Sequence, residues 1–186
     1  MSLNELVSNR VDFKLAVCHI HLESLKQIDK ETGSLSSSEG TGEAEKELDE
    51  FLYQIITAKD SLLQEINEKL GLKIPIREVT LGAINHELVR CGKSNVTNDL
   101  NQICNPQHWL WLLNEFHNHS KHRKMISRAV SVGIAENVNT GESSSSVQTR
   151  LINPVTQKPS DVDAVSFFDD MLKNMEKLVS DTGARC

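Results

Sequence analysis

Apolar residues recur every three or four positions through two long stretches of the chain, residues 3–30 and 44–70. The first stripe comprises Val7, Val11, Leu15, Cys18, Leu22 and Leu25, and the second includes Leu48, Phe51, Ile55, Leu62 and Ile66. This spacing is typical of amphipathic α-helices, which bury one face. At 1.5 Å per residue, two helices of this size are each about 40 Å long. The pattern therefore predicts a pair of long helices that pack as an antiparallel hairpin.

Three further helices follow from capping residues and shorter stripes. Thr80 is suited to cap a helix that ends near Gly92. Asn105 is a candidate N-cap and Pro106 suits the first helical position of the next helix. The core stripe of that helix is Trp109, Leu112, Leu113 and Phe116. Residues 160–181 form the last predicted helix, with Ser160 and Asp163 at a capping-box-like start.

Two other segments do not show helical spacing. Residues 33–43 are rich in Gly and Ser, and we expect a flexible loop there. In residues 128–152 apolar and polar residues alternate on both sides of the sequence NTGESSSS, which predicts a β-hairpin with its turn at 139–146. The expected fold is mainly α: a single domain over residues 1–186, built as a bundle of four or more helices with a small hairpin before the C-terminal helix.

Charge and composition exclude several classes of protein. The formal net charge of −6 gives the whole molecule no general attraction for nucleic acid or acidic membranes, so any binding of polyanions would be local. No run of residues approaches the roughly 18 apolar residues of a membrane span, and we expect no membrane contact. The four cysteines match no common disulfide or zinc framework, and no secretory signal is evident, so we expect a cytoplasmic protein.

The segment FHNHSKHRK, residues 116–124, carries the candidate functional residues. On a helix, residues three or four apart share a face. Asn114, His117 and Lys121 then form one stripe, and Trp111, Glu115, Asn118 and His122 form the next. Neither stripe coincides with the core stripe, so these side chains are free to face a groove or a partner.

The same region is locally positive. No Asp or Glu lies between Phe116 and Ala135, whereas Lys121, Arg123, Lys124 and Arg128 do. One explanation is that cations simply favour the end of a helix dipole. Others are an anion site, a metal site at His117, His119 and His122, or structural hydrogen bonding. Because residues two apart point about 200° away from each other on a helix, the histidines do not converge while the helix continues, and we predict no metal and no cofactor.

The sequence HNHSKH at 117–122 resembles the R-N-x-x-x-H signature of the HEPN superfamily, which are all-helical domains found in RNA-cleaving toxins and defence systems. Asn118 and His122 match the signature, and His117 stands where the family has arginine. A hairpin-like insert before a last helix is a similar feature. The resemblance implies a helical bundle, a homodimer in which two motifs face each other, and a polar residue from an earlier helix, for which Asp60 is a candidate.

Two functional hypotheses follow from the resemblance. In one, the chain is a non-catalytic member that dimerises and binds RNA, a nucleotide or a protein partner such as an antitoxin. In the other, it is a metal-independent endoribonuclease in which His122 is the general acid or base, Asn118 orients it, and His117 with Lys121 contacts the phosphate. Arg123, Lys124, Trp111 and Asp60 are the expected binding residues. Because histidine is shorter than arginine and mostly neutral at pH 7, the first hypothesis is favoured.

Overall fold

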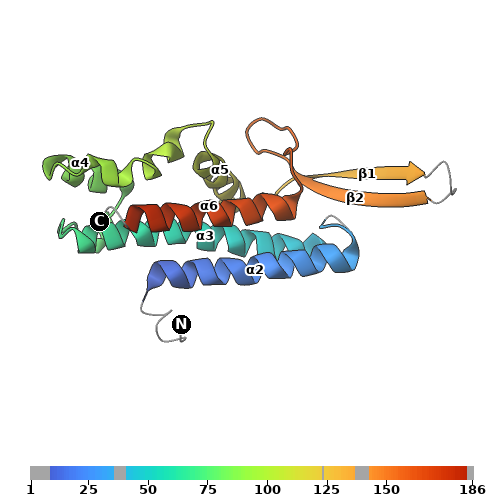
Figure 1. Ribbon diagram of the computed structural model, residues 1–186, viewed down its shortest axis with the longest axis horizontal. Helices are drawn as coiled ribbons and strands as arrows, with labels where there is room; N and C mark the ends of the chain where they lie inside the picture. Colours follow the sequence, from blue (N-terminus) through green and yellow to red (C-terminus); the bar gives the residue numbers. More distant parts are fainter. Residues whose placement is uncertain (1–8, 36–40, 123, 137–142, 184–186) are drawn as a thin grey trace.

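A computed structural model describes residues 9–35, 41–122, 124–136 and 143–183 (Figure 1). It confirms the predicted fold class, a helical bundle with a two-stranded antiparallel hairpin before the C-terminal helix. Buried apolar side chains from the helices form one continuous core. Among the described residues, no helix is both long and apolar enough to cross a membrane.

The two long helices are α2 (Arg10–Thr32) and α3 (Thr41–Lys69), which lie side by side (Figure 1). Asn9 is extended and caps α2, because its side chain accepts hydrogen bonds from the backbone N–H groups of Val11 and Asp12. The helix therefore begins at Arg10, and the start expected at residue 3 lies outside the described residues. The expected loop at 33–43 is shorter than predicted, since Leu35 is fully buried and α3 already begins at Thr41.

Helix α6 (Ala164–Gly183) covers this pair and brings the largest aromatic residues into the core. The rings of Phe168 and Phe51 meet edge to face at 5.1 Å, and those of Phe167 and Phe116 at 5.3 Å. Asp163 alone caps α6, by accepting the Ser166 backbone N–H at 2.9 Å. Ser160 does not take part in this cap as expected, because its hydroxyl donates to the Val162 carbonyl instead.

Between α3 and α6 the chain forms shorter elements. These are η1 (Ile76–Glu78), α4 (Leu81–Arg90), η2 (Ser94–Thr97), η3 (Leu100–Cys104) and α5 (Trp109–Lys121). Thr80 caps α4 as predicted, with its hydroxyl oxygen 3.1 Å from the Ala83 nitrogen. The predicted cap of α5 is wrong: Asn105 accepts from Gln107 within a turn, and α5 begins three residues later, after His108.

The predicted hairpin is confirmed as strands β1 (Arg128–Glu136) and β2 (Ser143–Leu151), which pair from Arg128–Leu151 to Glu136–Ser143. It extends away from the helices in Figure 1, and only its base is buried, at Thr149 and Leu151. Ser143–Ser146 are part of β2 and not of the turn as predicted, and the rest of the expected turn lies outside the described residues.

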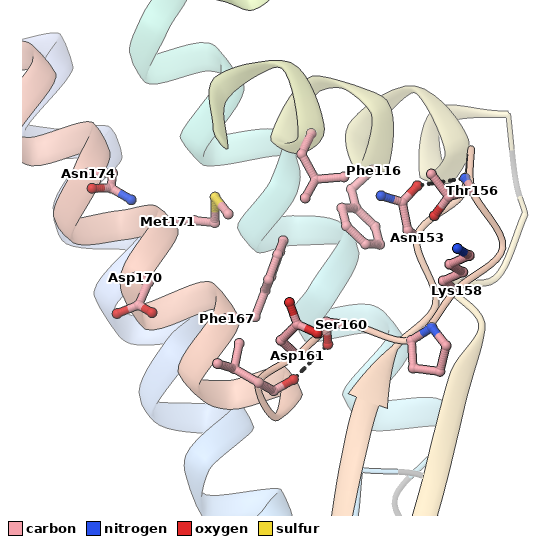
Figure 2. A pocket seen from close by; sticks show the side chains of 13 residues that line it. Phe116, Asn153, Thr156, Lys158, Ser160, Asp161, Phe167, Asp170, Met171 and Asn174 are labelled. Atoms are coloured by element: carbon pink, nitrogen blue, oxygen red, sulfur yellow. Dashed lines mark hydrogen bonds between the residues drawn. The ribbon is translucent and has the colours of Figure 1, made fainter. Parts of the chain in front are cut away.

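The connection from β2 to α6, residues 152–163, folds back against α5 and α6 (Figure 2). An isolated bridge between Ile152 and Pro159 closes it, and Asn153 accepts hydrogen bonds from the backbone of Val155 and Thr156. Gln157 adopts a left-handed backbone conformation with φ of 58°. The connection therefore has a defined shape, which makes it one wall of a pocket.

Candidate functional site at the end of helix α5

Hydrogen bonds cap both ends of helix α5, and residues 117–122 lie at its C-terminal end. At the start, the His108 ring nitrogen Nδ1 accepts the Leu110 backbone N–H at 3.3 Å. Leu110, Leu113 and Phe116 then fix the buried face of the helix. At the other end His122 is the C-cap residue, and its backbone N–H bonds to the carbonyls of Asn118 and Ser120. The predicted stripe of Asn114, His117 and Lys121 therefore lies within α5, whereas the second predicted stripe lies within the helix only as far as Asn118, because His122 is the C-cap.

The three histidines of the segment meet different surroundings. His119 is half-buried in a small cavity of about 30 Å³ that it shares with Phe116, Ile126 and the 152–157 connection. His117 is half-buried, and its electrostatic neighbours belong to α3 and to the next turn of α5. His122 is exposed at the helix end. Among the described residues, no three His, Cys, Asp or Glu side chains lie together in a way that could hold a metal ion.

His117 is placed where its neutral form is favoured. Burial lowers the pKa of its imidazole below the ordinary 6.5, and the charges of Lys121 and Lys59 lower it further. Asp60 raises this pKa by the smallest of the four contributions, so its carboxylate lies within electrostatic range of His117. The exposed Asp60 also forms an ion pair with Lys59 at 3.2 Å. The arrangement favours a neutral imidazole that donates one hydrogen bond at pH 7, with Lys121 as its cationic neighbour.

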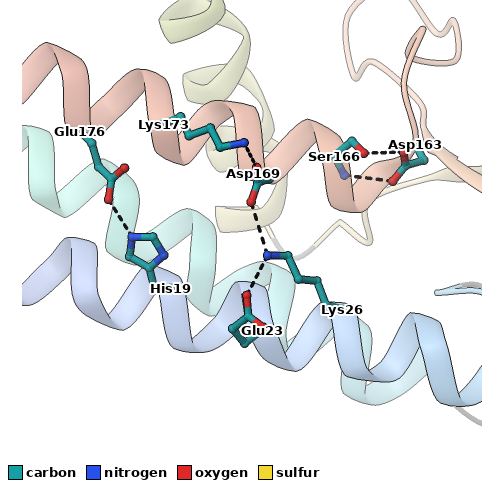
Figure 3. A network of polar contacts seen from close by, with 8 residues as sticks. All are labelled: His19, Glu23, Lys26, Asp163, Ser166, Asp169, Lys173 and Glu176. Atoms are coloured by element: carbon teal, nitrogen blue, oxygen red, sulfur yellow. Dashed lines mark hydrogen bonds and ion pairs between the residues drawn. The ribbon is translucent and has the colours of Figure 1, made fainter.

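The histidines outside this segment all have polar partners. His19 and His21 bond to Glu176 and Glu47, each at 2.7 Å, and the first pair is drawn in Figure 3. His86 lies 3.1 Å from a Glu87 oxygen, and His108 caps α5. In contrast, the side chains of His117, His119 and His122 make no hydrogen bond or ion pair with any described residue. The imidazoles of this segment therefore form no polar contact that holds the described part of the fold together.

Asn118 and Lys121 are exposed and also lack a side-chain partner in the described part of the chain. Together with His117 and His122 they form what we call the free group: His117, Asn118, Lys121 and His122. The free group contains all four residues predicted as catalytic. Its donors and its one fixed positive charge are available to a ligand that carries oxygen acceptors.

A second set of residues from the same region forms contacts that hold the fold together. We call it the anchored group: Ser120, Ile126 and Arg128. The Arg128 guanidinium bonds to Glu45 and to the Leu35 carbonyl, both at 2.7 Å, and its side chain is only 5% exposed. The other Glu45 oxygen accepts the Ile126 backbone N–H at 2.9 Å. Arg128 therefore does not belong to the predicted positive patch, because its charge is buried and neutralised by Glu45.

The third anchoring contact joins α5 directly to α3. The Ser120 hydroxyl donates to the Asp49 carboxylate at 2.5 Å. Glu45 and Asp49 stand four residues apart and so share one face of α3, which is the face that receives the end of α5 and the start of β1. These two carboxylates were not among the predicted site residues. Their spacing is the only signal in the sequence that indicates a common partner.

The remaining predicted binding residues are placed as follows. Lys124 is exposed and has no side-chain partner among the described residues, and Trp111 is half-buried on the stripe of Asn118. Arg123 lies outside the described residues. The structure thus brings Lys121 and Asp60 each within electrostatic range of His117, and it leaves Lys124 three residues beyond the end of α5.

No protein-family model matches the chain, and no curated protein or solved structure matches it either. The site must therefore be interpreted from its own geometry.

Proposed function

We propose that this chain is a cytoplasmic, HEPN-like RNA-binding protein that acts as a homodimer and does not itself cleave RNA. The observation that carries the proposal is the free group. Two histidines, Asn118 and the exposed Lys121 are concentrated in the last turn of α5 and its C-cap, and none of their side chains has a polar partner in the described part of the chain. The other four histidines of the chain all have such partners, which supports a role for this group in binding an external ligand.

RNA fits this surface better than a metal ion or an acidic protein face. Lys121 and Lys124 supply positive charge for phosphates, while His117, Asn118 and His122 supply neutral donors. Trp111 is half-buried on the same stripe as Asn118, and we expect its indole ring to stack on a nucleobase. Because the chain is acidic overall, the affinity depends on these few contacts and falls steeply with salt. Two copies whose α5 ends face each other double the number of cations around one strand.

Catalysis is disfavoured by the charge at position 117. The signature arginine is always charged, whereas burial and the neighbouring lysines lower the pKa of His117, so the imidazole adds no positive charge at neutral pH. Lys121 is then the only cation of the free group that can stabilise the developing charge on a phosphorane. RNA binding, unlike cleavage, does not require the site to stabilise this developing charge.

The experiment is a fluorescence anisotropy titration with a single-stranded RNA of about a dozen nucleotides, at several salt concentrations. We expect saturable binding by the wild type at low salt. Lys121→Ala should weaken it about threefold and reduce the slope of log affinity against log salt by about 0.7. Lys93→Ala is the matched control, since Lys93 is also exposed and lacks a side-chain partner among the described residues. No saturable binding, or an equal loss in Lys93→Ala, contradicts the proposal.

The endoribonuclease remains the second candidate, and one observation favours it. His122 is exposed without a polar partner among the described residues, so its ring can move a proton to or from a bound phosphodiester, with Asn118 four residues earlier to orient it. Incubation of the same RNA with the protein in EDTA separates the two candidates. Cleavage that is lost in His122→Ala establishes the nuclease, and intact RNA that stays bound supports the non-catalytic protein.

Dimerisation is tested separately by analytical ultracentrifugation. We expect a species with twice the mass of one chain. RNA binding by a strict monomer would contradict the dimer while leaving the RNA site in place.

A further inference from the structure

A pocket of about 450 Å³ lies between α5, α6 and the 152–163 connection (Figure 2). It is reached from a different side of α5 than the free group, because Leu112 and Phe116 line it while His117 and Lys121 stand on another stripe. Pockets that hold small molecules usually have volumes of about 300–1,000 Å³, with mostly apolar walls and a few polar groups. The volume of this pocket lies within that range, and its lining likewise combines apolar side chains with polar ones.

The floor of the pocket is apolar and aromatic. Phe116 and Phe167 meet there edge to face at 5.3 Å, and Figure 2 shows Met171 beside them. All three belong to the core and are at most 6% exposed, so their positions are fixed by packing on other faces. A flat or branched apolar group that enters the pocket therefore meets a preformed surface and does not have to open the core.

The 152–163 connection forms the wall opposite α6, and backbone hydrogen bonds fix its shape. The Asn153 backbone N–H bonds to the Lys158 carbonyl and the Gln157 N–H to the Asn153 carbonyl, both at 2.9 Å. The Ser160 N–H bonds to the Leu151 carbonyl at 2.7 Å. These bonds hold the connection as a compact loop, so the polar side chains that it carries at the rim start from fixed backbone positions.

The rim carries more negative than positive charge. Asp161 comes from the connection and Asp170 from α6, and Lys158 is the one cation of the lining. None of these three side chains makes an ion pair or a hydrogen bond with a described residue. On the same helix Asp169 forms ion pairs with Lys26 and Lys173, as Figure 3 shows, whereas Asp170 lies within electrostatic range of Lys173 without forming an ion pair. The two rim carboxylates are therefore available to neutralise a positively charged ligand.

We propose that this pocket binds a small amphipathic amine. Its apolar ring or branched chain lies against Phe116, Phe167 and Met171, and its ammonium group faces Asp161 and Asp170. The half-buried Asn174 side chain of α6, which also lacks a partner among the described residues, supplies a neutral hydrogen bond at the other end of the pocket. This site is independent of RNA binding, because it uses none of the free group.

The test uses three probes with the same phenyl ring and different charges: phenethylamine, benzyl alcohol and phenylacetate. Each is titrated into the full chain while ¹H–¹³C spectra follow the Met171 methyl group. We expect phenethylamine to bind with a Kd on the order of 1 mM or tighter, ahead of the alcohol and then the acid. Saturable shifts at Met171 with this order support the site. No saturation, or phenylacetate binding as well as the amine, overturns it.

Variants then test whether the two rim carboxylates cause the preference for a positively charged ligand. The double variant Asp161→Asn with Asp170→Asn should weaken phenethylamine about threefold or more, and it should narrow the difference from benzyl alcohol. Both positions are exposed, so the fold should be retained. Glu50→Gln with Glu68→Gln is the matched control, because it removes two exposed carboxylates outside the pocket. Equal weakening in the control overturns the assignment.

Discussion

Lys121 and Arg128 are both cations and lie only seven residues apart in the chain, yet they differ in burial and in their polar contacts. Arg128 is buried against Glu45 and the Leu35 carbonyl, and it joins the start of β1 to α3. Lys121 is exposed and makes no hydrogen bond or ion pair with a described residue. The same contrast separates the anchored group from the free group as a whole. What decides the role of each residue is the position of two α3 carboxylates, Glu45 and Asp49.

The contrast teaches that a count of charges along the chain does not define a binding surface. Four cations follow Phe116 without an intervening acidic residue, but one of them is cancelled by a carboxylate that lies 83 residues earlier. A second carboxylate, Asp49, holds Ser120 in the middle of the free group. The contacts of the anchored group therefore hold the C-terminal end of α5 in place, and the free group lies at that end of the helix.

The largest effect should come from breaking the anchored group at Arg128. Arg128→Met should lower the free energy of unfolding by about 3 kcal/mol, because it leaves the largely buried Glu45 carboxylate without its cation. Burial lowers the pKa of the Arg128 guanidinium and Glu45 opposes this, but an arginine stays protonated at any pH at which proteins fold. Urea unfolding followed by circular dichroism measures the change.

The control for this variant is Lys121→Met, which removes a charge of the free group. It should change the free energy of unfolding by no more than about 0.5 kcal/mol, because the side chain is exposed. If the two variants are equally stable, the division into an anchored and a free group is wrong.

The elements that sequence reasoning predicted well are those fixed by neighbours in the chain. The α2 and α3 stripes, the Thr80 cap and the alternation in 128–152 depend on spacings of two to four residues, which are visible in a single sequence. The errors at α5 and at residues 33–43 have a different cause. His108 takes the cap because its ring nitrogen accepts from Leu110, and Leu35 is buried because the chain there meets the base of the hairpin, where Ser34 bonds to Thr149 at 2.7 Å.

The candidate site shows the same limit. Helical geometry correctly placed His117 and Lys121 on one face, and the electrostatic contact with Asp60 links that face to α3. The Arg128–Glu45 pair and the pocket beside Phe167 depend on residues distant in sequence, which only the packing of α3, α5 and α6 brings together. A single sequence contains no periodic signal for such pairs.

A smaller effect is expected where the anchored group meets solvent, at Ser120. Ser120→Ala should lower the free energy of unfolding by about 1 kcal/mol, because it removes a hydrogen bond to a charged acceptor at a half-exposed position. Asn118→Ala is the matched control: it lies two residues away on the same helix, is exposed and lacks a side-chain partner among the described residues. We expect that variant to remain within about 0.5 kcal/mol of the wild type. A larger loss in Asn118→Ala than in Ser120→Ala would reverse the assignment of the two residues.

The smallest effect concerns the pH dependence of His117. Burial lowers its pKa from the ordinary 6.5, and Lys121 and Lys59 add to the lowering. The unfolded chain regains the ordinary pKa, so below about pH 6.5 it binds more protons at this residue than the folded protein does. The contribution of the neutral imidazole to stability is therefore fully present above pH 6.5. It is lost as the pH falls from 6.5 through the lowered pKa of the folded state.

Nuclear magnetic resonance titration of the His117 ring protons measures this directly. We expect a midpoint below 6.5 in the wild type, and a shift of the midpoint to higher pH in Lys121→Met, because one of the two neighbouring positive charges is gone. Lys93→Met should leave the midpoint unchanged. A midpoint above 6.5 would contradict this prediction and would show that His117 is more readily charged than an ordinary histidine. That result would remove the argument from charge against catalysis and would favour the endoribonuclease over the non-catalytic RNA-binding protein.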